Sequence, residues 1–247
     1  MNVYSVTRSI DKGGSRHGLP TILVSFAGCN MRCEYCREGY RPGDSSREHK
    51  VPDKSFVGPK AVADAIIAVA SEDGINNLTF SGGEPMMYES QMIDILEQLS
   101  LTTYRFAVNV RTNNSIDVRM FSDVYKDTIF SKLNGNSLMF TFSIKTSAAG
   151  EYEKDICVDL SKSIPRCFVA IDCISRSSHE IRNSIVVEAA TVEDLDYAAS
   201  LYRENTGIAA QFDWYVAPKW STGPSTLAQF IEYLHNNLDL RCWRLQI

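Results

Sequence analysis

The chain has 247 residues, of which 44% are hydrophobic and 22% charged, so it can bury a sizeable globular core. A net charge of −5 argues against the basic surface that duplex nucleic acid requires. No apolar run reaches the roughly 18 residues of a transmembrane helix, and the N-terminus lacks the apolar core of a signal peptide. Seven cysteines in a chain without such a signal fit a reducing compartment better than a disulfide framework. We therefore expect a cytoplasmic protein that binds neither nucleic acid nor membrane.

Segments with the periodicity of strands and helices alternate along the chain. Residues 1–19 are polar and contain several glycines, which predicts a loop, or a short strand followed by a turn. The strands expected after them are 20–27, 77–81, 104–110, 138–144, 166–172, 183–189 and 209–217, and the helices are 57–70, 89–99, 117–131, 191–205 and 225–237. Such alternation implies a parallel sheet, and about six β/α units are too few for a closed eight-fold barrel. We expect one α/β domain over residues 1–247, a partial, open barrel of about six parallel β/α units.

Three cysteines, Cys29, Cys33 and Cys36, follow the first long strand within eight residues. An iron–sulfur cube is normally held by four thiolates, so three leave one iron with a free coordination position. An open position distinguishes a metal site that performs chemistry from one that only stabilises a fold. The alternatives are a zinc site with a histidine as fourth ligand, or simply buried thiols. Against zinc, the nearest histidines, His17 and His49, are each isolated in the sequence.

A second motif, Gly82-Gly83-Glu84-Pro85, ends the next strand. The two glycines let the backbone approach a ligand closely, and the carboxylate of Glu84 can accept a hydrogen bond from an ammonium group. A glycine turn before a helix is the alternative for this segment alone. Because parallel α/β folds place their chemistry at the carboxyl ends of strands, the two motifs in this order favour a shared site.

The CxxxCxxC spacing followed by GGEP resembles the signature of radical S-adenosylmethionine (SAM) enzymes. The resemblance implies a 4Fe–4S cluster on the three cysteines, with its open iron chelated by the amino and carboxylate groups of SAM. An electron from the reduced cluster would then cleave SAM and release a 5'-deoxyadenosyl radical. The resemblance also implies that Gly82, Gly83 and Glu84 bind the amino group of SAM.

Further cofactor-binding candidates lie beside the cysteines and at other strand ends. Tyr35 occupies the position where the superfamily usually has an aromatic or apolar residue near the adenine, and packing beside the cluster is the alternative. Thr112 and Asn113 can hydrogen-bond ribose hydroxyls, although asparagine-rich loops are also common in turns. Ser143 and Lys145 end the fourth strand, where the lysine can neutralise the carboxylate of SAM or remain solvated.

Within the superfamily the chain is most similar to 7-carboxy-7-deazaguanine synthase. The similarity implies a lyase, usually a homodimer, that performs a magnesium-assisted ring contraction of 6-carboxytetrahydropterin on the path to 7-deazapurines such as queuosine. The expected partners are a small-molecule substrate and an electron donor, either a reductase or a flavodoxin or ferredoxin. The similarity rests on Gly14-x-x-x-Gly18-x-Pro20, on residues 111–116 against an ETNGxI-like loop, on Ser143-Ile-Lys145 with Ser147 and Gly150 against an SxKxxSSG-like loop, and on residues 243–247.

The chain departs from that family at several positions, of which those of Gly13 and Ser25 lie in the substrate pocket of the family. Gly13 replaces a glutamate of a QGEG-like turn, Ser25 replaces an arginine, and Arg111 replaces the glutamate of the ETNG-like loop. Arg37-Glu38 replaces an Asp-Thr pair whose threonine helps to hold magnesium, and of these two only Glu38 offers an oxygen ligand. A different substrate on the same scaffold, a glycyl-radical-enzyme activase, and a non-enzymatic zinc or iron–sulfur binding module therefore stay open as alternatives.

Overall fold

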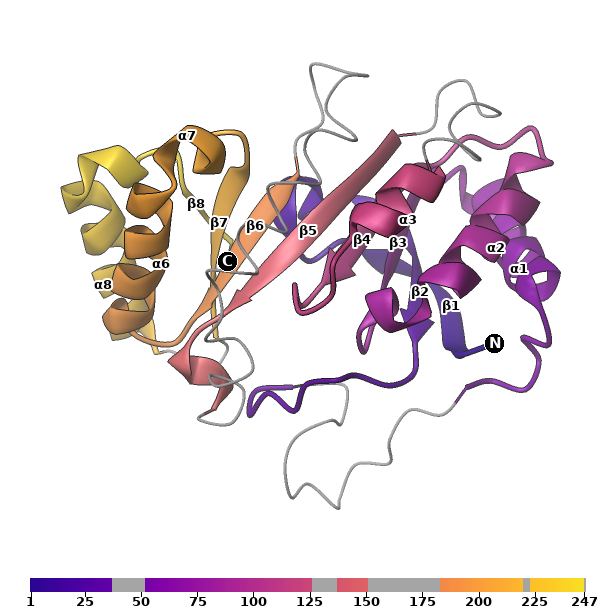
Figure 1. Ribbon diagram of the computed structural model, residues 1–247, viewed down its shortest axis with the longest axis horizontal. Coiled ribbons are helices and arrows are strands. Elements are labelled where there is room, and N and C mark those ends of the chain that lie inside the picture. The colour runs from indigo at the N-terminus through magenta and orange to yellow at the C-terminus, as the bar shows by residue number, and fades with distance from the viewer. Residues whose placement is uncertain (37–51, 126–136, 151–182, 220–222, 247) are drawn as a thin grey trace.

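The computed structural model describes residues 1–36, 52–125, 137–150, 183–219 and 223–246 (Figure 1). The expected strand 166–172, the end of the expected helix 117–131 and the pair Arg37-Glu38 lie outside the described residues.

The described strands form one eight-stranded sheet in the order of the sequence. Its first strand pairs antiparallel with the second, and every later neighbouring pair is parallel. The first and last strands are the two edges, so the sheet is an open barrel, as expected. The strands are β1 (Val3–Ile10), β2 (Pro20–Phe26), β3 (Asn77–Gly82), β4 (Ala107–Thr112), β5 (Ser137–Lys145), β6 (Ser184–Ala189), β7 (Asp213–Pro218) and β8 (Arg244–Leu245).

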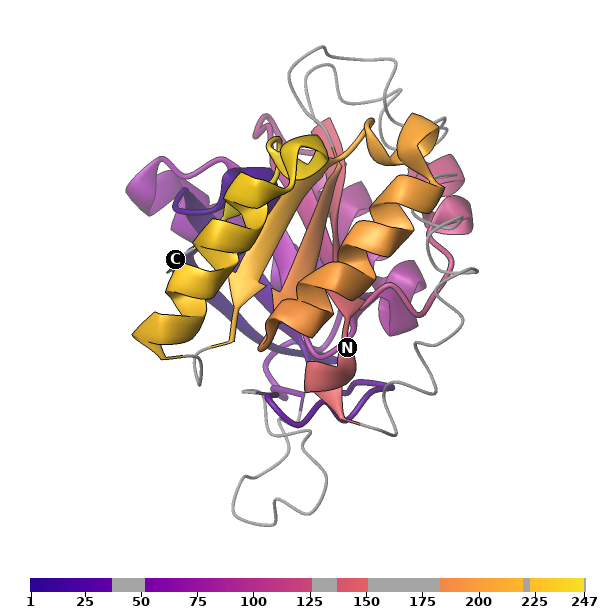
Figure 2. The same ribbon diagram turned by 90° about the vertical axis from the view of Figure 1, so that its left-hand side faces the viewer.

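Helices cover the outer face of this sheet, with α6 and α8 over one half and α1, α2 and α3 over the other (Figure 1, Figure 2). The sequence explains several helix boundaries: α1 starts after the extended Gly58 with a proline and ends at the left-handed Gly74, and α6 starts with a capping box between Thr191 and Asp194. No helix in the described ranges is long and apolar enough to cross a membrane. The helices are α1 (Pro59–Asp73), α2 (Glu89–Ser100), α3 (Arg119–Val124), α6 (Val192–Glu204), α7 (Thr206–Ala209) and α8 (Pro224–Asn236), and short 3₁₀ turns span Gly14–Arg16, Pro85–Tyr88, Ser147–Ala149 and Leu238–Leu240.

The expected and observed elements differ mainly at their ends. β4 starts at Ala107 rather than at 104, because residues 101 and 102 still hydrogen-bond to the last turn of α2. β7 starts at Asp213 rather than at 209, because the preceding residues form α7. The N-terminal segment contains the eight-residue β1, and the two-residue β8 was not expected because it is too short to show a period.

The two faces of the sheet have opposite polarity, because successive strand residues point to opposite sides. Side chains that face the helices are apolar and fully buried, for example Phe80, Val110 and Phe140. The face inside the open barrel carries polar groups, and a hydrogen bond of 3.1 Å joins Thr141 Oγ1 to Asn109 Oδ1. This polar interior leads towards the carboxyl ends of the strands.

The turn between β1 and β2 enters the barrel interior from the other end. Asp11 is 2% exposed, and one of its oxygens accepts hydrogen bonds from Thr79 Oγ1 at 2.8 Å and Asn109 Nδ2 at 3.2 Å. Gln246 Nε2 donates to the carbonyl of Gly14 at 3.0 Å. The next residue after Asp11, Lys12, thereby reaches the cavity described below.

Candidate active site

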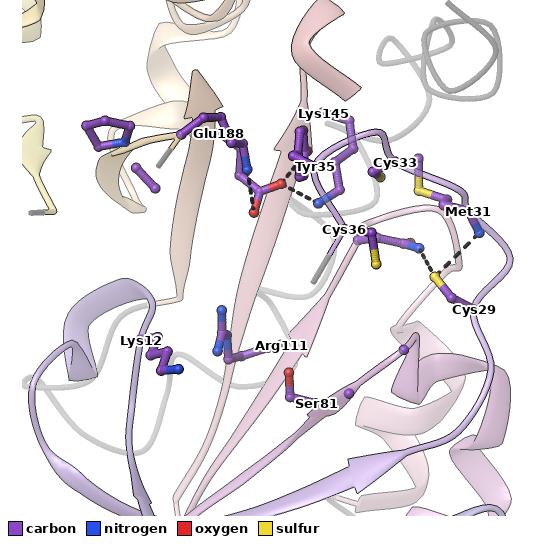
Figure 3. Close-up of a pocket in the computed structure, with 16 residues that line it drawn as sticks. Lys12, Cys29, Met31, Cys33, Tyr35, Cys36, Ser81, Arg111, Lys145 and Glu188 are labelled. Carbon is purple, nitrogen blue, oxygen red and sulfur yellow. Dashed lines mark hydrogen bonds and ion pairs between the residues drawn. The ribbon is translucent and has the colours of Figure 1, made fainter. Parts of the chain in front are cut away.

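The loop that follows β2 carries the three cysteines, and all three line a cavity at the carboxyl ends of the strands (Figure 3). Cys33 is 8% exposed and packs with Met31 and Ala149, while Cys29 and Cys36 are half-buried. A backbone hydrogen bond of 2.9 Å from Glu34 to the carbonyl of Ala149 ties this loop to the segment after β5. The loop is thus connected to the end of β2 by the chain and to the segment after β5 by this hydrogen bond.

The environment of Cys29 suits a metal-bound thiolate. Its sulfur accepts hydrogen bonds from the backbone N–H of Met31 at 3.4 Å and from Asn113 Nδ2 at 3.8 Å, the kind of contact that tunes cluster sulfurs. Burial raises the pKa of the Cys29 thiol to about 12, so a cationic centre is needed to replace its proton. In the part of the chain that the structure describes, no three histidine, cysteine or acidic side chains gather around one point as ligands of a single ion do. A cube instead binds each thiolate to a separate iron, and three thiols on one cavity wall fit that requirement.

Gly82 and Gly83 bring the end of β3 against the cysteine loop. The N–H of Gly83 donates to the carbonyl of Phe26 and that of Glu84 to the carbonyl of Gly28, both at 2.9 Å. A Cβ on Gly83 would lie 1.8 Å from the Gly28 carbonyl oxygen, and Gly82 has a φ of +104°. Both glycines also line the cavity, so their backbone is available to a ligand there.

The Glu84 side chain is fully buried and points into the protein instead of lining the cavity. Its carboxylate accepts hydrogen bonds from the backbone N–H groups of Met86 at 2.9 Å and Asn113 at 2.6 Å, and from Thr112 Oγ1 at 2.8 Å. Burial raises the pKa of Glu84, and these hydrogen bonds oppose the rise. Glu84 therefore links the ends of β3 and β4, while its contact with a SAM ammonium stays a prediction.

The main cavity has a volume of about 390 Å³, and a smaller one of about 160 Å³ shares much of its lining. Of the residues predicted from the sequence, the structure brings the three cysteines, Tyr35, Gly82, Gly83, Asn113 and Lys145 to the main cavity. Thr112 and Ser143 reach only the smaller one. Met31, Ser81, Ala217 and Pro218 contribute further surface to the main cavity.

A charged cluster that the sequence did not predict forms one wall of the main cavity (Figure 3). Glu188, near the end of β6, accepts hydrogen bonds from Tyr35 Oη and Lys145 Nζ, each at 2.5 Å. Lys219 Nζ lies 3.3 Å from the other Glu188 oxygen and 3.3 Å from the centroid of the Tyr35 ring. Lys145 is therefore an ion-paired residue, with a second hydrogen bond of 3.1 Å to Ser143 Oγ, rather than a solvated lysine.

The members of this cluster hold one another in their charged forms against the cost of burial. Burial alone would raise the pKa of Glu188, but the ammonium groups of Lys145 and Lys219 and the hydrogen bonds outweigh it and hold the pKa below its usual range. Burial lowers the pKa of Lys219 to about 8, although Glu188 opposes this change. Two lysines and one glutamate leave one net positive charge on this wall.

Replacing Glu188 with alanine should lower the free energy of unfolding by about 3 kcal/mol, because two nearly buried ammonium groups would lose their counter-ion. Urea unfolding of the cluster-free protein measures this change. The exposed pair Arg203–Asp239 provides the control, because D239N should cost less than about 1 kcal/mol. A loss for E188A no larger than that for D239N would contradict a buried ion cluster.

The low pKa of Lys219 predicts a stability difference that depends on pH. Between about 8 and the ordinary value of 10.5, the unfolded chain binds this proton and the folded one does not, so the free energy of unfolding rises with pH. Relative to K219Q, the cluster-free wild type should gain at most about 3 kcal/mol over this range, at 1.36 kcal/mol per pKa unit. Urea titrations of both proteins at several pH values test this, and a constant difference would refute it.

The departures from the family at Gly13, Ser25 and Arg111 take different places in the structure. Ser25 is 3% exposed on β2 and does not line the main cavity. Gly13 is buried in the turn that enters the barrel, directly beside the Arg111 side chain, and Arg111 lines both cavities. Two of the three departures are thus spatial neighbours.

An open, mostly parallel barrel whose carboxyl end presents three thiols and a glycine-rich strand end is the arrangement that the resemblance to radical SAM enzymes implies. In agreement, residues 14–133 match the 4Fe–4S single cluster domain family. The fold is also that of the crystal structure of QueE from Escherichia coli, with a TM-score of 0.60 and 18% identity, over 98% of this chain and 91% of that one.

Curated relatives give the same assignment. A 7-carboxy-7-deazaguanine synthase of Clostridium acetobutylicum is 27% identical over 46% of each chain, and one of Methanopyrus kandleri is 29% identical over 48% of this chain and 50% of the relative. The chain thus spans about half the length of these two relatives. A 7-carboxy-7-deazaguanine synthase of Methanospirillum hungatei is 21% identical over 98% of this chain and 81% of the relative. The chain thus resembles radical SAM proteins and, among them, 7-carboxy-7-deazaguanine synthase.

Proposed function

We propose that this protein is a radical SAM enzyme that cleaves SAM reductively at a 4Fe–4S cluster and acts on a small-molecule substrate. The observation that carries the proposal is the position of the cysteine loop. Its three thiols open onto a cavity of about 390 Å³ at the carboxyl end of the barrel. When bound, the reduced cluster supplies the electron that converts SAM into methionine and a 5'-deoxyadenosyl radical.

Several residues around the cavity support the proposed binding of SAM. The backbone at Gly82 and Gly83 lies beside the cysteine loop, where it can accept hydrogen bonds from the amino group of SAM. The net positive wall of Lys145, Glu188 and Lys219 suits the carboxylate of SAM. Tyr35 lies in the same wall, and its ring is available to the adenine only on a face that Lys219 does not cover.

Replacing Glu84 with alanine should weaken SAM binding about tenfold while leaving the cluster in place. The substitution removes the acceptor that holds the Thr112 hydroxyl and the Asn113 N–H, and so releases the strand ends that shape the site. Calorimetric titration of the cluster-loaded protein with SAM measures the change, and E84Q, which keeps the shape of the side chain, should lose less. An E84A protein that cleaves SAM at the normal rate would contradict this role.

The names of the curated relatives support 7-carboxy-7-deazaguanine as the product. The resemblance to that family implies 6-carboxytetrahydropterin as the substrate and a ring contraction in queuosine biosynthesis as the reaction. A reductase, flavodoxin or ferredoxin would deliver the electron, and a homodimer would be the working form. Arg37-Glu38, at the position where the resemblance places a magnesium ligand, lies outside the described residues. The assay is therefore run with and without Mg²⁺.

The test is an anaerobic assay with reconstituted protein, dithionite, SAM and 6-carboxytetrahydropterin, with and without Mg²⁺. Formation of 7-carboxy-7-deazaguanine would support the specific reaction. A second candidate, radical SAM chemistry on a different substrate, is favoured by Gly13 and Ser25, which stand where the resemblance implies a glutamate and an arginine of the substrate pocket. Formation of 5'-deoxyadenosine without the deazaguanine would select this second candidate.

A further inference from the structure

The cavity has a second cationic region, formed by Lys12 and Arg111, apart from the lysine wall. Both residues line the main and the smaller cavity, and Figure 3 shows them together, away from the thiols. Lys12 comes from the turn after β1 and is exposed, whereas Arg111 comes from β4 and is half-buried. Neither side chain forms a hydrogen bond or ion pair with another residue in the described ranges.

The Arg111 guanidinium lies where a side chain at position 13 would point. Gly13 has an extended backbone, with φ −154° and ψ 150°, which any residue can adopt. A Cβ on Gly13 would lie 3.2 Å from Arg111 Nε and 3.4 Å from both Cζ and Nη2. A side chain at position 13 would therefore press on Arg111, which would have to shift by a few tenths of an ångström.

Gly13 and Arg111, two of the departures from the family, are therefore direct neighbours in the structure. The resemblance to 7-carboxy-7-deazaguanine synthase implies a glutamate at each position, whereas this chain has no carboxylate at either and one guanidinium. Among the described residues that line the main cavity, Glu188 supplies the one carboxylate, and it is already paired with Lys145 and Lys219. The charge of Arg111 therefore has no acidic partner of its own in this lining.

A half-buried guanidinium without a carboxylate partner among the described residues suits an anionic ligand. Its planar donors match a carboxylate or a phosphate with two parallel hydrogen bonds, and a neighbouring ammonium adds attraction. We propose that Arg111, assisted by Lys12, binds a carboxylate or phosphate group of the substrate. This inference rests on the proposed function for turnover, but binding of the anion does not require the radical reaction.

Equilibrium binding to the cluster-loaded, oxidised protein without SAM tests the proposal. The probes are 6-carboxypterin, pterin, which lacks the carboxylate, and inorganic phosphate. The wild type should bind 6-carboxypterin at least about tenfold more tightly than pterin, with phosphate as a competitor. R111Q should remove this preference, and so should G13E, because its carboxylate would pair with Arg111. K60Q changes an exposed lysine of α1 and should bind like the wild type.

The outcomes separate the ligand classes and the two proposals. Phosphate binding that depends on Arg111, without binding of either pterin, would assign a phosphate-bearing substrate. Equal affinities for the two pterins, a preference that survives in R111Q, or no binding of any probe would overturn the proposal. Anion binding that depends on Arg111 in a protein that forms no 5'-deoxyadenosine would leave this site in place and reject the enzymatic function.

Discussion

Replacing Cys33 with alanine is expected to reduce the iron and sulfide content after anaerobic reconstitution from about four of each per chain to nearly none. Cys33 is the central thiol of the loop and the most buried of the three, so no other described side chain can take its place without unpacking Met31 and Ala149. Two thiolates cannot retain a cube in which one iron already lacks a protein ligand. Metal analysis and the visible absorption of the reconstituted protein measure the loss.

The matched control is Cys242→Ala. Cys242 is exposed, and its sulfur lies 3.9 Å from the Tyr202 hydroxyl, in a part of the fold away from the cavity. C242A should therefore bind as much iron as the wild type. A C33A protein with a full complement of iron, or a wild type that takes up zinc without iron and sulfide, would contradict the assignment of the three cysteines.

Replacing Gly83 with alanine is expected to destabilise the cluster-free protein by about 3 kcal/mol or more and to impair cluster assembly. The added Cβ would lie 1.8 Å from the Gly28 carbonyl oxygen and 2.5 Å from its carbonyl carbon. Both are backbone atoms, so no rotamer change relieves the overlap. Either β3 or the start of the cysteine loop must move, and the hydrogen bond from Glu84 N to that carbonyl would be lost.

Urea unfolding and iron content of the same preparations measure both effects of G83A. Gly207→Ala provides the control, because a Cβ at Gly207 meets nothing within 4 Å and the residue lies in the short helix α7. G207A should not lower the free energy of unfolding, and alanine in this helix should raise it by at most about 1 kcal/mol. A G83A protein as stable and as rich in iron as G207A would show that the close approach of the two segments is unnecessary.

The sequence alone predicted the open barrel and the location of the cysteine loop because both depend on short-range patterns. The cysteines and the glycine motif follow neighbouring parallel strands, and the carboxyl ends of such strands meet at one edge of a sheet. The cluster around Glu188 could not be predicted from the sequence, because its members lie far apart in the chain. Its members meet because β5 and β6 pair with Lys145 opposite Glu188, while Tyr35 arrives from a distant loop.

Two other features were hidden for similar reasons. The direction of the Glu84 carboxylate depends on the hydrogen-bond donors of Thr112 and Asn113 at the end of β4. The sequence shows only that a polar residue ends a strand, and not whether its side chain is buried or faces the cavity. The contact between Gly13 and Arg111 depends on a turn that enters the barrel, about a hundred residues before β4. In the sequence the available signals are separate: a charged residue at a strand end, Arg111, and a glycine without an evident turn role, Gly13. Only the fold brings the two together.

The most direct test of the radical SAM assignment is the formation of 5'-deoxyadenosine. Anaerobically reconstituted wild type and C33A are each incubated with dithionite and SAM, and the products are separated by chromatography. The wild type should release 5'-deoxyadenosine and methionine, while C33A should release neither above the level of a control without protein. A wild type that holds a complete, reducible cluster and leaves SAM intact, with substrate candidates present or absent, would contradict the proposed function.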